Sequence, residues 1–141
     1  MTDKLDLTSL HKALLQLSDA IEFYHSSTVQ NNHRLLTHMR AAVIQAFEFT
    51  YELSWKMLKR YLEMTEPNPL EVDQMSFPHL IRTGNERGLL KSDVSVWLLY
   101  RKERGTTSHA YDEDKANEVL ESIPAFLSDA QFLYEQLQKH D

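Results

Sequence analysis

The sequence predicts an all-α fold, namely an antiparallel up-and-down four-helix bundle with one short extra helix. The 141 residues include only 3 glycines and 4 prolines, so there are few points at which a helix must stop. Apolar residues recur every three or four positions along most of the chain, and no segment alternates between apolar and polar residues as a half-buried strand does. The length suits one domain over residues 1–141 with a core of its own.

Two helices are expected in the first half of the chain. The first covers residues 7–26, and a polar break follows until residue 32. The second, residues 33–64, is the longest, and a loop over residues 66–71 should follow it. Its apolar face is broader than one neighbouring helix covers, so we expect it to be central or to lie at a subunit contact. That face consists of Val43, Ile44, Phe47, Phe49, Tyr51, Leu53, Trp55, Met57, Leu58 and Leu62.

Three further helices are expected in the second half. A short one begins after Ser76, with Pro78 in its first turn, and ends at Gly88. The next begins at residue 92 or 93 and carries an apolar stripe toward residue 100. The last covers residues 114–139 and again presents one apolar side. Together with the first two, these segments give the four long helices and the one short helix of the predicted bundle.

The composition of the chain argues against some classes of function. Acidic residues outnumber Lys and Arg by 21 to 15, and the net charge of −6 argues against general nucleic-acid binding, which depends on neutralising phosphates. A local basic patch could still hold a nucleotide. The chain has no cysteine, no apolar run of transmembrane length and no recognisable leader. We therefore expect a cytoplasmic protein that does not associate with membranes.

The segment 104–111 places an arginine, a histidine and a tyrosine between two helical patterns. Arg104 and His109 would face different ways on a continuous helix, so they converge only if the helix ends between them. Gly105 is the expected end, because glycine readily adopts the left-handed conformation of a helix cap. His109 and Tyr111 are two positions apart and would project from the same side of an extended segment.

These residue types suit phosphate chemistry. Arg104 offers a planar fork to a phosphate, and the imidazole of His109 can act as a general acid or base. In the structural alternative, Arg104 caps carbonyl groups, His109 bonds to the backbone and Tyr111 packs on the bundle. Arg101, one turn before Arg104, either extends this basic face or is solvated.

Glu48 and Glu52 form a second candidate site, because they are four residues apart and share one helical face. They could bind a cation or orient a basic group of a ligand. The alternative is that they form ion pairs with Lys56, with Lys59 or with an arginine of the fourth helix. Elsewhere, Trp55 and Trp97 are expected to be core residues.

Several kinds of site are missing from the sequence. No histidines stand at the spacing of metal ligands, so we expect no metal site. The chain also lacks a phosphate-binding loop, the Gly-Ser and paired aspartates of a nucleotidyltransferase, and a serine or cysteine nucleophile motif. It should therefore hold no cofactor of its own and should not catalyse nucleotidyl transfer alone.

Three parts of the sequence together resemble the nucleotidyltransferase substrate-binding protein family, within the HEPN superfamily. They are the segment 45–56 (QAFEFTYELSWK), Trp97 shortly before Arg104, and the segment 108–113 (SHAYDE). The resemblance covers most of the chain. It implies a helical bundle that forms a homodimer and pairs with a separately encoded minimal nucleotidyltransferase, on which the nucleoside triphosphate and Mg²⁺ would bind. This chain would line the site for a nucleotide or a small phosphorylated substrate. Its candidate substrate-binding residues are Glu48, Glu52, Arg101, Arg104, His109 and Tyr111.

The resemblance also implies an alternative. Some HEPN relatives are metal-independent ribonucleases, in which the residues corresponding to Arg104 and His109 are catalytic, and RNA would then be the substrate. In some pairs the nucleotidyltransferase adenylylates the tyrosine that corresponds to Tyr111 and silences the toxin. Gly105 stands where the ribonucleases commonly have Asn or Asp, which favours the binding function. A purely structural helical dimer is the third possibility.

Overall fold

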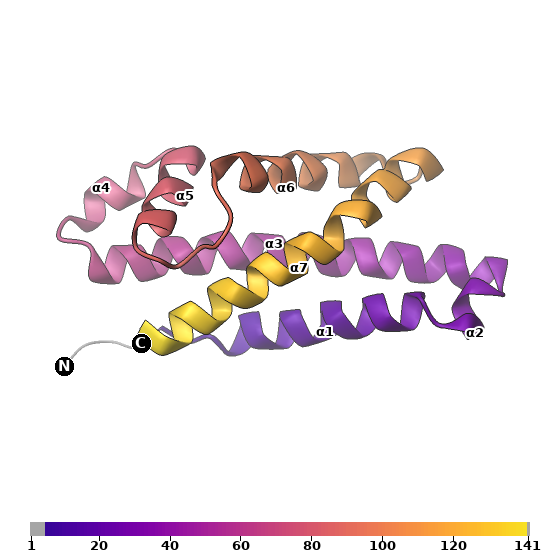
Figure 1. Ribbon diagram of the computed structural model, residues 1–141. Helices are drawn as coiled ribbons and strands as arrows, with labels where there is room; N and C mark the ends of the chain where they lie inside the picture. The colour runs from indigo at the N-terminus through magenta and orange to yellow at the C-terminus, as the bar shows by residue number, and fades with distance from the viewer. Residues whose placement is uncertain (1–4, 141) are drawn as a thin grey trace.

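Long helices dominate the computed structural model, which describes residues 5–140 (Figure 1). The four longest are α1 (Thr8–Tyr24), α3 (His33–Thr65), α6 (Val94–Thr106) and α7 (Glu113–His140). They run alternately up and down, and α7 crosses the bundle diagonally. No strand occurs between residues 5 and 140. The all-α fold with an up-and-down arrangement is thus confirmed.

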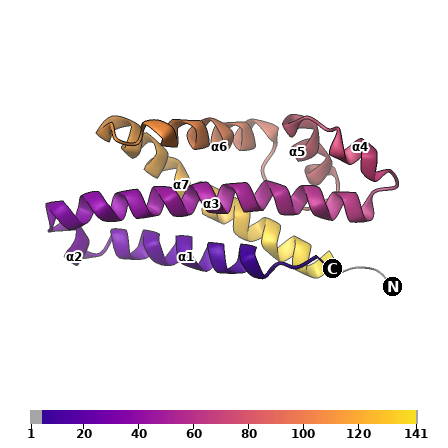
Figure 2. The same ribbon diagram turned by 180° about the vertical axis from the view of Figure 1, so that it is seen from behind.

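Helix α3 is the centre of this arrangement, as its broad apolar face predicted. It packs against α1 and α7 and also against α2 (Ser27–Gln30), α4 (Pro69–Asp73), α5 (Phe77–Glu86) and α6. Figure 2 shows α1 and α6 on opposite sides of α3, with α4 and α5 near its C-terminal end. One member of the predicted face is exposed, because Phe49 is 58% accessible, and Leu53, Trp55 and Met57 are only partly buried. The face of α3 is therefore divided between the core and the surface.

Two of the short helices were not predicted. Helix α2 lies in the segment expected as a polar break, and α4 overlaps the loop expected at residues 66–71. Each begins at a side-chain cap, because Ser26 accepts a hydrogen bond from the Val29 amide and Asn68 accepts one from the Leu70 amide. Each also buries one valine. A cap and a single anchor are enough for one turn, but they leave no periodic pattern in the sequence.

The centre of the core is aromatic. Phe126 of α7 lies with its ring centroid 5.1 Å from that of Phe47 on α3 and 5.3 Å from that of Tyr100 on α6, in edge-to-face geometry. Trp97 of α6 is 6.1 Å away. The buried hydroxyl of Tyr100 also donates a hydrogen bond to Asp129 of α7. These contacts fix α6 against α3 and α7, and this position determines where the arginines of α6 project.

The end of α6 differs from the prediction. The helix passes through Gly105 to Thr106 and continues as a 3₁₀ turn, Thr107–His109. Among residues 5–140, only Gly88 has a positive φ, of 75°. The hydroxyl of Thr107 donates to the Arg104 carbonyl at 2.6 Å and that of Ser108 donates to the Gly105 carbonyl at 3.0 Å. Because these hydroxyls satisfy the last carbonyls, a left-handed glycine cap is not required.

In the described part of the chain, no helix has both the length and the apolar character needed to cross a membrane.

Candidate functional site

The candidate site is a cavity of about 510 Å³ between α3, α4, α5 and α6, which we call the α3–α6 pocket. A volume of this size is typical of small-molecule sites. Three residues predicted from the sequence line it, namely Glu52, Arg101 and Arg104. The other lining residues are Tyr51, Trp55, Lys59, Val72, Met75, Phe77, Leu80 and Gly105. The pocket thus combines an aromatic and aliphatic surface with a charged wall.

Aromatic rings form one side of the pocket. Tyr51 is buried, and its ring centroid lies 6.4 Å from that of Phe77 at the start of α5. Trp55 follows Tyr51 by one helical turn and is only half-buried, so the prediction that it is a core residue is wrong in part. Trp97 is 1% exposed, as predicted. Trp55 packs on the core and also presents part of its ring to the pocket.

Burial changes the chemistry of Tyr51. It raises the pKa of the phenol to about 12, although the nearby Arg101 and Arg104 act in the opposite direction. The phenol is therefore protonated at neutral pH. Tyr51 is a neutral wall of the pocket and not a base.

The charged wall is built around Arg104. Its Nη1 lies 3.6 Å from Glu48 Oε2, and its Nε lies 3.5 Å from Glu52 Oε1. Nη1 also donates to the hydroxyl of Thr107 at 3.2 Å. Glu52 is in addition 3.8 Å from Lys56. The alternative that the two carboxylates pair with an arginine of the fourth helix is thus the arrangement observed.

Arg101 has different surroundings. Its guanidinium carbon lies 5.0 Å from the ring centroid of Phe77, a cation–π distance. Lys59, the other pocket cation, is 3.1 Å from Asp73. Within residues 5–140, no carboxylate lies at ion-pair distance from Arg101. Arg101 is therefore an exposed pocket cation that contacts the Phe77 ring and whose charge no described carboxylate neutralises.

His109 and Tyr111 lie outside the pocket, at the junction of α6 and α7. Their ring centroids are 6.2 Å apart, and Tyr111 is 88% exposed, so the alternative that it packs on the bundle is wrong. In the described residues, no hydrogen bond joins Arg104 to His109, because Arg104 is held by Glu48 and Glu52. One chain therefore presents the predicted residues as two groups, a pocket with Arg101 and Arg104 and an exposed tip with His109 and Tyr111.

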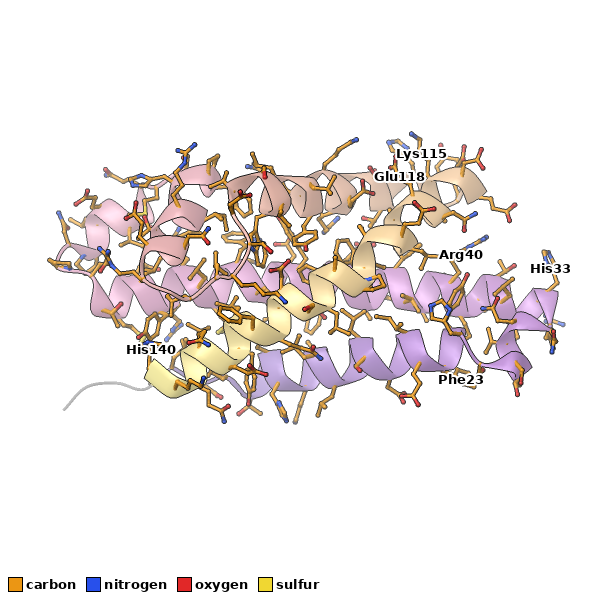
Figure 3. All side chains as sticks on the ribbon, viewed as in Figure 1. Phe23, His33, Arg40, Lys115, Glu118 and His140 are labelled. Atoms are coloured by element: carbon orange, nitrogen blue, oxygen red, sulfur yellow. The ribbon has the colours of Figure 1, made fainter. Side chains whose placement is uncertain are left out.

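The end of the bundle beside this tip is also charged. Figure 3 shows Lys115 and Glu118 near the start of α7, at the end of the molecule where Arg40 projects from α3. Arg40 lies 3.6 Å from Glu113. This ion pair joins the start of α7 to α3 close to Tyr111.

Sequence reasoning missed part of the pocket. Tyr51 and Trp55 are four residues apart, and this spacing could have indicated a shared aromatic face beside Glu52. No comparable signal exists for Phe77, Met75 or Lys59. They reach the pocket because α4 and α5 fold back over the end of α3, a tertiary arrangement that local patterns do not encode.

Comparisons with known proteins agree on the family. Residues 5–139 match the family described as nucleotidyltransferase substrate binding protein like. The chain is 38% identical over 149 aligned positions to a probable ribonuclease HepT of Haemophilus influenzae, covering 100% of this chain and 97% of that protein.

Two solved structures share the fold. A Haemophilus influenzae protein described as having the fold of a substrate binding domain of a nucleotidyltransferase superimposes with a TM-score of 0.89 and 34% identity, over 94% of this chain and 99% of that one. A protein of Thermus thermophilus gives a TM-score of 0.71 and 28% identity, over 91% of this chain and 98% of that one.

Proposed function

This chain belongs to the nucleotidyltransferase substrate-binding protein family, and we propose that it is the substrate- or nucleotide-binding subunit of a two-component nucleotidyltransferase. The observation that carries the proposal is the α3–α6 pocket, which has the volume of a small-molecule site and a basic residue at its wall. A separately encoded minimal nucleotidyltransferase would supply Mg²⁺ and the nucleoside triphosphate. This chain would then bind the acceptor and would not carry out transfer alone.

We also propose that the subunit is a homodimer. The support is the apolar face of α3, of which Phe49 remains 58% exposed after the bundle has formed. A two-fold contact would bring two copies of one patch together. In such a dimer, the exposed tip of each chain, with His109 and Tyr111, could contact the nucleotidyltransferase or the second copy.

Co-purification tests the proposal. The tagged chain is expressed together with the neighbouring reading frame, which we expect to encode a small chain with Gly-Ser and Asp-x-Asp motifs. The two chains should be retained together after washing at moderate salt. A neighbour of another kind, or a nucleotidyltransferase that washes away completely, would contradict the pairing.

A second candidate function, a ribonuclease toxin, is favoured by one specific observation: the relative named as a probable ribonuclease matches over the full length of the chain. In this function Arg104 and His109 would be catalytic. Because Arg104 is paired with carboxylates in one chain, its site would need a rearrangement or a second copy. Cleavage of RNA in the presence of EDTA, lost in His109→Ala, would support this function. Intact RNA and harmless expression would exclude it.

Tyr111 is the candidate acceptor for adenylylation. Its exposed phenol is accessible to a partner enzyme, and His109 lies beside it and could take the proton as the oxygen attacks the α-phosphate of ATP, with pyrophosphate leaving. Intact mass after incubation with the partner, ATP and Mg²⁺ should show one or more added AMP groups. Tyr111→Phe should show none. Equal labelling of the two proteins would remove Tyr111 from this role and leave the binding function in place.

A further inference from the structure

We infer that the ligand of the α3–α6 pocket is a small molecule with a planar aromatic ring and one anionic group, and that Arg101, not Arg104, binds the anion. This inference rests on the proposed function and specifies the chemistry of its ligand. It follows from three features of the pocket: its aromatic side, its charge balance and its glycine.

The aromatic side provides the surface for a ring. Trp55 and Phe77 come from different helices and both line the cavity, while the buried Tyr51 closes it from the core side. Half-buried aromatic rings that do not pack fully against one another leave faces on which a planar ligand can stack. Val72 and Leu80 complete an apolar lining that would exclude water from such a ring.

The presence or absence of an ion pair at each of the three cations in the pocket indicates which of them would bind the anionic group of a ligand. Arg104 is neutralised by Glu48 and Glu52, and Lys59 by Asp73, so neither brings a free positive charge to a ligand. Arg101 lines the same cavity without a carboxylate partner among the described residues. Its guanidinium carbon lies 5.0 Å from the centroid of the Phe77 ring, a contact that favours a position at the edge of the pocket. Arg104 is a positioning residue that pairs with Glu52 at the wall of the pocket and with Glu48 outside it.

One unneutralised cation suits one anionic group. A nucleic acid strand presents many phosphates and needs several free cations, which this pocket does not provide within the described residues. A single phosphate or carboxylate on an aromatic molecule matches both the charge and the volume of about 510 Å³.

Gly105 supports the presence of a ligand at this wall. It lies inside α6 with an ordinary helical φ, so its backbone does not need a glycine. A Cβ at this position would meet no heavy atom within 4 Å, so packing inside the chain does not need one either. Yet Gly105 lines the pocket. Glycine at a helical position that costs stability and serves no contact of its own chain is explained if a ligand approaches the helix there.

Calorimetric titration of the full chain tests the inference with four probes. AMP carries ring and phosphate, and 4-hydroxyphenylacetate carries ring and carboxylate. Adenosine has the ring without the charge, and ribose 5-phosphate has the charge without the ring. At least one of the first two should bind saturably, and adenosine and ribose 5-phosphate should bind about tenfold more weakly than the tighter of them or not at all. The tighter of the two identifies the anion as phosphate or carboxylate.

Amino-acid substitutions test whether the probe binds in the α3–α6 pocket. Arg101→Ala should weaken the tighter probe by about tenfold or more, because a charge-assisted contact is lost. Arg82→Ala removes another exposed arginine, one that lies outside the pocket, and should change nothing. Gly105→Leu, which fills the open wall, should also weaken binding, while circular dichroism confirms that each variant is folded. The bound probe should change the tryptophan fluorescence through Trp55, since Trp97 is buried, and this change should be absent in Trp55→Phe.

Two results would overturn the inference. One is no saturable binding of either AMP or 4-hydroxyphenylacetate. The other is binding that Arg101→Ala and Gly105→Leu leave unchanged. Because co-purification with the nucleotidyltransferase is measured separately, a chain that pairs with its partner but fails these titrations contradicts the ligand chemistry and leaves the proposed function standing.

Discussion

Arg101 and Arg104 show how far a residue's role depends on its neighbours. The sequence singled out Arg104, because it begins the spacing that ends at His109 and Tyr111. The structure places Arg104 between Glu48 and Glu52 and leaves Arg101 beside Phe77 without a carboxylate. Spacing could predict that the arginines and glutamates face one another, but only the packing of α6 on α3 decides which cation is neutralised.

The different surroundings predict different effects on stability. Arg104→Ala leaves the half-buried Glu48 without its cation and Glu52 with Lys56 alone, and it should lower the free energy of unfolding by about 1 kcal/mol. Arg101→Ala should change it by less than about 0.5 kcal/mol. Urea denaturation at neutral pH measures both. An equal cost for the two variants, or no cost for Arg104→Ala, would contradict the ion-pair role of Arg104.

Glu103 is buried beside these arginines but faces α7. Burial raises the pKa of its carboxyl above the ordinary value of 4.5, and Glu118 adds to the effect. A carboxyl with a raised folded-state pKa contributes stability at low pH and loses it as the pH rises through that pKa. Glu103→Gln should therefore stabilise the protein by about 1 kcal/mol at pH 7 and by less at pH 4. A benefit that does not depend on pH would refute this explanation.

At the scale of elements, periodicity predicted the long helices well, because each buries an apolar face every three to four residues. It missed α2 and α4, which a cap and one buried valine suffice to form. The sequence also predicted that α6 ends at Gly105, because glycine commonly terminates helices. That prediction did not allow for the hydroxyls of Thr107 and Ser108, which bond the last carbonyl groups of the helix.

Replacing Gly88 and replacing Gly105 with alanine should change the stability of the protein in opposite directions. Gly88 follows α5 with a φ of 75°, so Gly88→Ala forces a strained backbone and should cost about 1 kcal/mol. Gly105 lies inside α6 with open space around it, so Gly105→Ala should gain about 0.5–1 kcal/mol. Thermal unfolding of the two variants measures both signs. A loss of stability in Gly105→Ala would show that α6 needs its glycine.

At the scale of the whole molecule, several large apolar and aromatic side chains remain exposed on the surface of the single chain. Phe49 and Leu15 are each 58% exposed on α3 and α1, and Tyr111 is 88% exposed at the junction of α6 and α7. We predict a homodimer through the exposed part of the α3 face, so Phe49→Glu should shift the protein toward the monomer without unfolding it. Sedimentation velocity at micromolar concentration measures this. A wild-type protein that is monomeric throughout would contradict the prediction.

The most direct test of the central claim, that this chain is the binding subunit of a nucleotidyltransferase pair, is light scattering on a mixture of the two purified chains. We expect a single species that is heavier than the homodimer of this chain and contains both proteins. Two species that keep the masses of the separate chains at every concentration tested would contradict the claim.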